Sequence, residues 1–367
     1  MTLGVIVLSD GTIFSGKSVG VNGFCVGEIV FNTAMSGYEE ILTDPSYAQQ
    51  IISFTSPHIG NTGINYSDQQ SPKIWASGVI MREISPYFNH RLGKISLSKY
   101  LIQQKIVALT EIDTRQLTHI IREKGNLAAC LLTGDDVDFA LHQAKLFYAL
   151  NSKNNDKTLI IKSPQIMQKP GNDIHFVVID YGIKKSILTY LLEKGCNLTI
   201  VPAHTSYEDI MSYQPEGILL SNGPGDPSLL TEPVKTIQKI IANKIPLFAI
   251  CLGHQFFALA CGAKITKLKF GHHGANHPVY DYVNNKILIS SQNHNYVVAD
   301  DHLPSSLQVT HRSLFDNSIA GLKYHHAPAF SFQGHPEGNP GPHDCEYLFD
   351  LFINSIKNKL VTTTTIM

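Results

Sequence analysis

Apolar and polar residues alternate differently in the two halves of the chain. In the C-terminal half, short and nearly continuous apolar runs alternate with segments of helical periodicity. The predicted strands cover residues 176–179, 198–201, 217–220 and 247–250, and the predicted helices cover 184–194, 236–243 and 255–261. Because continuous apolar strands are typical of a parallel sheet buried on both faces, this half is predicted to be an α/β domain with a mostly parallel sheet flanked by helices.

The N-terminal half has shorter strand signals and one clear amphipathic helix. Strands are predicted at residues 5–8, 28–31, 50–54 and 76–81, and the helix is predicted near 114–122. This mixture indicates an α+β domain. A polar stretch with Pro and Gly follows it. The predicted organisation is therefore an N-terminal domain at 1–150, a linker at 151–172 and a second domain at 173–367.

Composition narrows the classes of function. With 367 residues the chain exceeds the usual size of a single core, and its formal net charge of -1 gives no basic surface for nucleic acid or an anionic membrane. The apolar N-terminus runs into the turn signal Ser9-Asp10-Gly11, so it is predicted to be a strand and not a signal peptide. Six scattered cysteines favour reduced thiols, and the expected compartment is the cytoplasm.

Cys251 is the first candidate for chemistry, because it lies between the predicted strand 247–250 and the predicted helix 255–261. A sharp strand-to-helix turn exposes a nucleophile, frees the next backbone N–H as an oxyanion donor and directs a helix N-terminus at the sulfur. Most free cysteines are instead inert packing residues. The position at a strand end, between the small residues Ala249 and Gly253, favours the catalytic interpretation.

His335 and Glu337 supply what a catalytic thiol needs. An imidazole, with a pKa of about 6.5, can remove the thiol proton and later protonate the leaving group. Glu337 would orient the ring if the stretch around Pro336 is extended, since residues i and i+2 then project to the same side. A His-Pro-Glu sequence alone is more often part of an ordinary surface loop, so this hypothesis depends on the pairing with Cys251.

A third segment, 221–227, follows the predicted strand 217–220. Gly223 and Gly225 bracket Pro224, so backbone amides of this loop can approach a ligand closely and supply the second oxyanion donor. The same residues also fit an ordinary tight turn.

Together these segments, 251–255, 223–225 and 334–337, resemble the signatures of class I, triad-type glutamine amidotransferases. Further segments resemble the carbamoyl-phosphate synthetase small subunit family, and they lie at residues 31–47, 57–61, 269–274, 292–294 and 341–344. The resemblance covers nearly the whole chain except the predicted linker. The N-terminal segments are what separate this family from other class I glutaminases.

The resemblance implies a glutaminase whose Cys251 attacks the glutamine carboxamide, while the N–H groups of Leu252 and Gly225 hold the oxyanion. His335 would protonate the departing ammonia and then activate water, and Glu337 would orient His335. The glutamine-binding residues that it implies are Ser46, Gly223, Gly225, Leu252, Gln255, Asn293, Asn295 and Tyr296.

Two residues depart from the family pattern, because Ala249 and Asn295 stand where glycine is usual. Alanine is small enough for the tight turn, so little distortion is expected there. If position 295 requires a positive φ, asparagine is among the more tolerant residues. Its side chain is expected to narrow the glutamine pocket.

The implied partner is the large synthetase subunit, which would make carbamoyl phosphate from bicarbonate, ATP and the delivered ammonia, for arginine or pyrimidine biosynthesis or both. ATP and Mg are expected on that partner, because this chain has no Gly-rich Walker loop. No cofactor is expected in this chain. The N-terminal domain is expected to dock the partner and to form one wall of the glutamine site, and the heterodimers can assemble further.

Histidine is a common metal ligand, and several histidines lie close together in the sequence. They are His272, His273, His277, His325 and His326. No cysteine or carboxylate lies near them at ligand spacing, and adjacent histidines in a strand point to opposite faces. No metal site is therefore expected, and a loop at the rim of the active site is the preferred interpretation.

Two other classes of function stay open. A stand-alone amidase with the same cysteine triad would not need a large docking domain. A non-catalytic regulatory subunit would not need to keep Cys251, His335 and Glu337. Glutaminase activity measured with and without the synthetase subunit separates the first of these from the coupled enzyme.

Overall fold

The computed structural model describes residues 2–151, 161–301 and 303–364, and it divides into two compact units. The first unit contains the described residues before 152 together with Lys269–Gly274, and the second contains the other described residues. Part of the predicted linker, residues 152–160, lies outside the described residues.

The strands of the first unit form a closed barrel with the order β1-β2-β8-β6-β4-β3-β9. Their bounds are Leu3–Leu8 for β1, Ile13–Ser18 for β2, Phe24–Asn32 for β3, Gln50–Phe54 for β4, Gly78–Ile80 for β6, Val107–Thr110 for β8 and Ala128–Thr133 for β9. Side chains alternate along these strands, so Ile6 and Leu131 lie in one core while Val7 and Cys130 pack with the helix α4 (Val137–Asn151).

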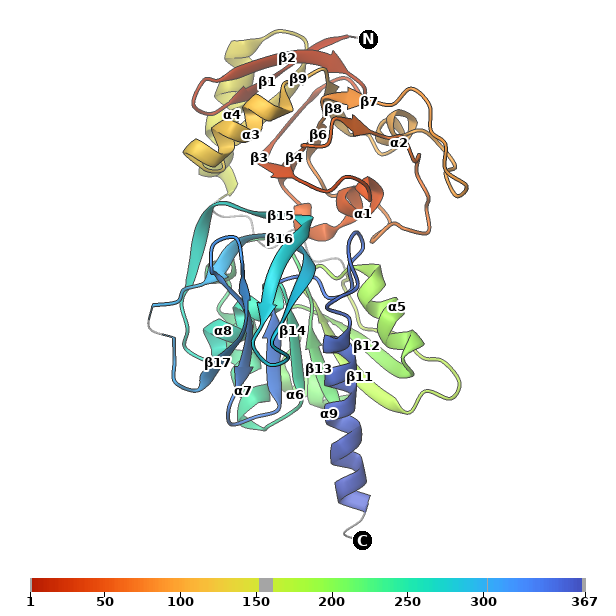
Figure 1. The fold of residues 1–367 in the computed structure, drawn as a ribbon, viewed down its shortest axis with the longest axis vertical. Helices are drawn as coiled ribbons and strands as arrows, with labels where there is room; N and C mark the ends of the chain where they lie inside the picture. The colour runs from red at the N-terminus through yellow and green to blue at the C-terminus, as the bar shows by residue number, and fades with distance from the viewer. Residues whose placement is uncertain (1, 152–160, 302, 365–367) are drawn as a thin grey trace. The chain divides into compact units, whose positions relative to one another are not determined.

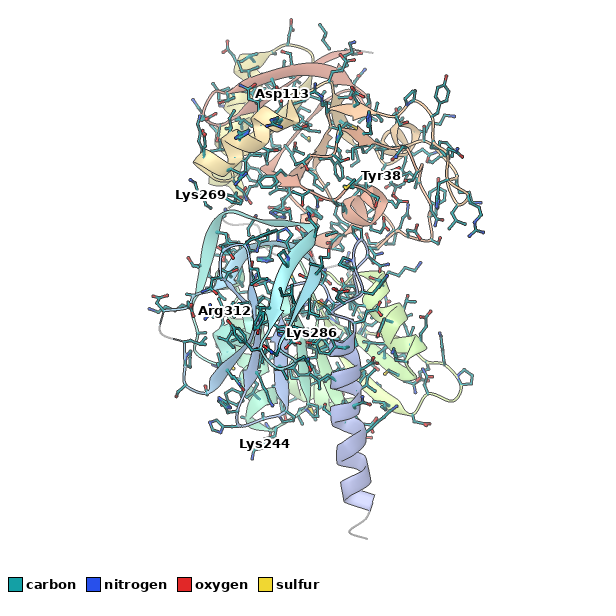
Figure 2. The ribbon with its side chains drawn as sticks, viewed as in Figure 1. Tyr38, Asp113, Lys244, Lys269, Lys286 and Arg312 are labelled. Atoms are coloured by element: carbon teal, nitrogen blue, oxygen red, sulfur yellow. The ribbon has the colours of Figure 1, made fainter. Side chains whose placement is uncertain are left out.

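Shorter elements complete the first unit. β5 (His58–Ile59) pairs in parallel with β7 (Glu83–Ile84), and the remaining helices are α1 (Tyr38–Thr43), α2 (Leu97–Gln103) and α3 (Thr114–Lys124). Asp113, labelled in Figure 2, is the N-cap residue of α3. Its carboxylate accepts a hydrogen bond from the N–H of Gln116 at 2.9 Å. Such an N-cap satisfies a backbone donor that the helix itself cannot. The buried face of α3 then joins the barrel core.

The second unit is built on one sheet with the order β10-β12-β11-β13-β14-β19-β18-β17-β15-β16. The five strands from β12 to β19 in this order are parallel, and β10, β18, β17 and β15 pair antiparallel with their neighbours. Their bounds are Gln165–Met167 for β10, Ile174–Asp180 for β11, Cys196–Pro202 for β12, Gly217–Leu220 for β13, Leu247–Ile250 for β14, Ile265–Asp281 for β15, Lys286–Val298 for β16, Leu307–Ser313 for β17, Ile319–Tyr324 for β18 and Ala329–Phe332 for β19.

Helices cover both faces of this sheet (Figure 1). α5 (Lys185–Glu193) and α9 (Tyr347–Thr364) pack on one face, and α6 (Tyr207–Ser212), α7 (Glu232–Ala242) and α8 (Leu252–Ala260) pack on the other. The neighbouring residues Val177 and Val178 show the division, because Val178 lies in the core with α5 and α9 while Val177 lies in the opposite core. The predicted α/β class with a mostly parallel sheet is confirmed.

The described half of the predicted linker contains a strand. β10 pairs antiparallel with β12, with Ile166 opposite Thr199, and Ile166 is 64% exposed. A strand of this length is too short for apolar alternation to be recognised in the sequence.

Within the described ranges, every helix is too short or too polar to serve as a membrane span. All six cysteines are free thiols.

Replacing Phe352 by Ala is expected to lower the free energy of unfolding of the second unit by about 3–5 kcal/mol. Phe352 in α9 is fully buried and stacks on Phe176 with 4.8 Å between ring centroids. Its neighbour Leu351 is 50% exposed, so Leu351→Ala is the matched control, with an expected change below about 0.5 kcal/mol. Denaturant unfolding followed by circular dichroism measures both, and equal losses would contradict this placement of α9.

Candidate active site

Four neighbouring parallel strands end at the candidate residues. β11 leads to Lys184, β13 to the loop 221–227, β14 to Cys251 and β19 to His335. In the sheet these strands are adjacent in the order β11-β13-β14-β19. Because the carboxyl ends of parallel strands meet at the same edge of a sheet, all four segments converge there.

Cys251 lies in a strained turn between β14 and α8. Its backbone angles are φ 52° and ψ -106°, a conformation that non-glycine residues rarely adopt. Its N–H donates to the carbonyl of Phe332 at 2.9 Å, which ties the turn to β19. A Cβ on Gly253 would lie 2.6 Å from the carbonyl oxygen of Leu220, so glycine is needed for α8 to begin this close to the sheet.

His335 and Glu337 form a buried hydrogen-bonded pair, with His335 Nδ1 and Glu337 Oε1 2.8 Å apart and each side chain 1% exposed. The stretch between them is a tight turn, because the N–H of Gly338 donates to the carbonyl of His335 at 3.1 Å. Pro336 occupies the turn position that its fixed φ favours. The predicted extended conformation is therefore wrong, although the turn also brings the ring and the carboxylate together.

Lys184 belongs to the same cluster and was missed by the sequence analysis. Its ammonium lies 2.8 Å from Glu337 Oε1 and donates to the carbonyl of Gly338 at 2.8 Å, and its side chain is 2% exposed. One signal could have revealed it: Lys184 is the N-cap residue of α5. A cation is disfavoured there by the helix dipole, so a compensating carboxylate elsewhere in the chain is to be expected.

Opposing charges fix the protonation states of this cluster. Burial lowers the pKa of His335, but the carboxylate of Glu337 raises it more, and the resulting pKa is about 10. Burial raises the pKa of Glu337, but the charges of Lys184 and His335 lower it more, to about 2. At neutral pH an ionised Glu337 therefore lies between two cations, Lys184 and protonated His335.

Cys251 lies beside the ring of His335, close enough for its thiol to contribute to the raised pKa of that ring. The thiol itself donates to the carbonyl of Asn293 at 3.5 Å. Nε2 of His335 is buried and finds no hydrogen-bond partner in the part of the chain that the structure describes. This nitrogen is thus available to exchange a proton with a thiol or a substrate, and such contacts often tighten only when substrate binds.

The two predicted oxyanion donors lie on separate segments. Leu252 is the first residue of α8, and the first N–H groups of a helix have no acceptor within it. Gly225 has φ 105°, a conformation that favours glycine. Its loop is anchored by Asn222, whose side chain accepts from the N–H of Lys184 at 3.2 Å and donates to the carbonyl of Gly182 at 3.0 Å.

Several predicted glutamine-binding residues lie around α8 and β16. Gln255, in the first turn of α8, donates from Nε2 to the carbonyl of Tyr296 at 2.8 Å. Asn293 and Asn295 are buried in β16. Asn295 has a negative φ, so the expected need for a glycine-like backbone does not arise at this position.

Two further residues singled out in the sequence, Ala249 and Ser46, lie in different units. Ala249 is fully buried within β14, where it pairs with Leu220 of β13. Ser46 belongs to the first unit, in the 3-10 helix η1 (Pro45–Tyr47), and its N–H donates to the carboxylate of Asp44 at 2.9 Å. All the predicted site residues except Ser46 thus lie in the second unit.

Across residues 2–151, 161–301 and 303–364, no three His, Cys, Asp or Glu side chains lie close enough together to hold a metal ion. Of the histidines noted in the sequence, His273 lies by the ring of Tyr47, with centroids 6.1 Å apart. His277 lies against Phe315, at 4.9 Å.

Both units match known family models. Residues 177–355 match Glutamine amidotransferase class-I, and residues 6–131 match Carbamoyl-phosphate synthase small chain, CPSase domain.

Relatives align with nearly the whole chain. The carbamoyl phosphate synthase small chain of Pectobacterium atrosepticum is 47% identical over 370 residues, which cover 96% of this chain and 97% of the relative. That of Vibrio cholerae is 47% identical, with 96% and 98% covered, and that of Escherichia coli is 46% identical, with 96% and 97% covered. The chain therefore belongs to the carbamoyl phosphate synthase small chain family, as its motifs predict, and carries a class I glutamine amidotransferase domain.

Proposed function

We propose that this glutaminase chain hydrolyses glutamine with Cys251 as the nucleophile, His335 as the general acid and base, and Glu337 as the group that orients and charges His335. One observation supports these roles above all: the buried series from Lys184 through Glu337 to His335 ends beside a thiol on a strained strand-to-helix turn. Burying these charges costs free energy. A catalytic function accounts for that cost, because perturbed protonation states of this kind cluster at active sites.

The reaction begins with the proton on the ring. Glu337 raises the pKa of His335, which favours the protonated ring. In the proposed attacking state the proton resides on Nε2, and the Cys251 sulfur attacks the carboxamide carbon as the thiolate. A carbon–sulfur bond forms, and the N–H groups of Leu252 and Gly225 stabilise the resulting oxyanion. When the oxyanion collapses, the carbon–nitrogen bond breaks and His335 protonates the departing ammonia.

The second half of the reaction releases glutamate. His335, now neutral, takes a proton from a water molecule, and the water oxygen attacks the γ-glutamyl thioester. The carbon–sulfur bond breaks, and the thiolate and the protonated ring are restored.

Glutamine binding by Gly223, Gly225, Gln255, Asn293, Asn295 and Tyr296 is proposed from the family resemblance. The hydrogen bond from Gln255 to the carbonyl of Tyr296 supports a shaped wall beside the nucleophile. The roles of Ser46 and of the N-terminal domain, in binding glutamine and in docking a partner, stay predictions from the resemblance.

Membership in a small chain family implies a large chain as partner. We propose that the ammonia passes to it, and that bicarbonate, ATP and Mg bind there while this chain needs no cofactor. The free thiols are consistent with a reducing compartment, the cytoplasm.

Cys251→Ser is expected to lower glutamine-dependent carbamoyl phosphate synthesis by about 1,000-fold or more in the complex with the large chain. Added ammonium should support synthesis at the parental rate, because only the glutaminase step needs the thiol. Cys261→Ser, at the other end of α8, is the matched control and should keep both rates. Loss of the ammonium-dependent rate in Cys251→Ser would mean that Cys251 is structural.

The alkaline limb of the pH profile of glutaminase kcat/KM is expected to move in opposite directions in two variants. Glu337→Gln removes a charge that raises the pKa of His335. The ring then loses its proton at lower pH, and the alkaline limb moves to lower pH. Lys184→Met removes a charge that lowers the pKa of His335, so the alkaline limb moves to higher pH. Ammonia release measured across a pH series tests this, and shifts in the same direction would refute the electrostatic assignment.

Glutaminase activity is expected to be low in the isolated chain and to rise at least about tenfold when the large chain is added, because an uncoupled glutaminase would release ammonia with no acceptor. Ammonia release by the two preparations at equal chain concentration is the measurement. Equal and high activity in both would favour a stand-alone amidase.

A further inference from the structure

The loop at 221–227 is anchored at its beginning, but Gly225 at its tip does not hold its own backbone in place. Asn222 binds two backbone groups. Gly223 packs so closely on the backbone of Tyr181 that a Cβ would lie 2.1 Å from its carbonyl oxygen. Gly225 is exposed, and glycine restricts the backbone less than any other residue. An oxyanion donor is effective only if it is in place before charge develops, so the tip needs a further contact.

Tyr296 in β16 supplies that contact, because it is bound at both of its ends. Its carbonyl accepts the hydrogen bond from Gln255 Nε2 at 2.8 Å, and Gln255 lies in the same first turn of α8 as Leu252. Its hydroxyl donates to Asp226 Oδ2 at 3.1 Å, and Asp226 directly follows Gly225. A single residue thus connects the segments that carry the two proposed oxyanion donors.

Asp226 is suited to pass this constraint to the loop. Its Oδ1 accepts from the N–H of Ser228 at 2.9 Å and from the Ser228 hydroxyl at 2.6 Å, so both carboxylate oxygens are engaged. With its side chain held on both sides, the backbone next to Gly225 has little freedom to move away from β16.

We propose that Tyr296 is a positioning residue whose hydroxyl holds Asp226, and so keeps the N–H group of Gly225 at a fixed separation from that of Leu252. The proposal rests on the proposed function, since it concerns the oxyanion formed by attack of Cys251. The hydroxyl acts through Asp226 and does not touch the reacting atoms. Removing the hydroxyl is therefore expected to weaken the binding of the transition state more than the binding of the substrate.

Tyr296→Phe tests this, because it removes only the hydroxyl. In the complex of the full chain with its large chain, glutaminase kcat should fall about 10-fold while KM changes less than about 2-fold, since complete loss of an oxyanion donor costs about 100- to 1,000-fold. Ammonium-dependent synthesis should be unchanged, which shows that the variant folds and assembles. Tyr280→Phe is the matched control, because the Tyr280 hydroxyl binds Asn285 in the hairpin between β15 and β16, and its kcat should equal that of the parent.

A double-mutant cycle tests whether Tyr296 and Asp226 act together on the position of Gly225 or act independently. Asp226→Ala should lower kcat by the same factor of about 10, and the double variant Tyr296→Phe, Asp226→Ala should lose no more than either single variant. Additive losses would overturn the proposal.

Glutamate γ-semialdehyde, an aldehyde analogue of glutamine, distinguishes positioning from general damage. The Cys251 sulfur bonds to its carbonyl carbon, the C=O π bond opens onto the oxygen, and the thiol proton passes to His335. The product is a tetrahedral adduct whose oxyanion is stabilised by the two donors. In Tyr296→Phe the Kd of the aldehyde should rise about 10-fold, while the Kd of glutamine, measured in a Cys251→Ser background, stays unchanged. Equal weakening of both ligands, or of neither, overturns the proposal, whereas a parent chain that forms no covalent adduct overturns the proposed function itself.

Discussion

The buried ion pair between Lys184 and Glu337 is the interaction on which the active site depends. Both side chains are almost fully buried, at 2% and 1% exposure, so neither charge can be left alone without a cost of about 3–5 kcal/mol. The pair joins the beginning of α5 to the turn after β19, and Glu337 transmits its effect to His335 through a hydrogen bond of 2.8 Å. Glu337 thus keeps the ring of His335 protonated, and Lys184, which is distant in the sequence, keeps Glu337 ionised.

The parallel sheet makes this pair possible, and it also holds Cys251, the proposed nucleophile, in a strained conformation. Adjacent strand ends present Lys184, the loop at 221–227, Cys251 and His335 at one edge of the second unit's sheet. The unusual backbone conformation of Cys251 persists because its N–H is bonded to Phe332 and because Gly253 lets α8 approach β13. Tyr296 links α8 to the loop at 221–227, through its carbonyl to Gln255 and through its hydroxyl to Asp226.

Local pattern was enough to predict the features that depend on neighbouring residues. The apolar runs at β11, β12, β13 and β14 are short and continuous, and this pattern predicts buried parallel strands. The position of Cys251 at the end of one of them can be read from the same pattern. Lys184 was not visible, because its partner Gly338 is 154 positions away and nothing near Lys184 marks the contact. The turn at Pro336 was misjudged, since proline fits both an extended segment and a turn. β15 was missed because it is long and polar, and its middle residues Lys269–Gly274 belong to the first unit.

Intact-mass and peptide mass spectrometry of the full chain, quenched in acid during turnover with glutamine, tests the central claim most directly. The account predicts a γ-glutamyl thioester on the peptide that contains Cys251, formed by attack of its sulfur on the carboxamide carbon of glutamine. An adduct on another cysteine, such as the buried Cys345 or the partly buried Cys261, or turnover with no adduct on any cysteine under conditions where thioester hydrolysis is slowed, would contradict it.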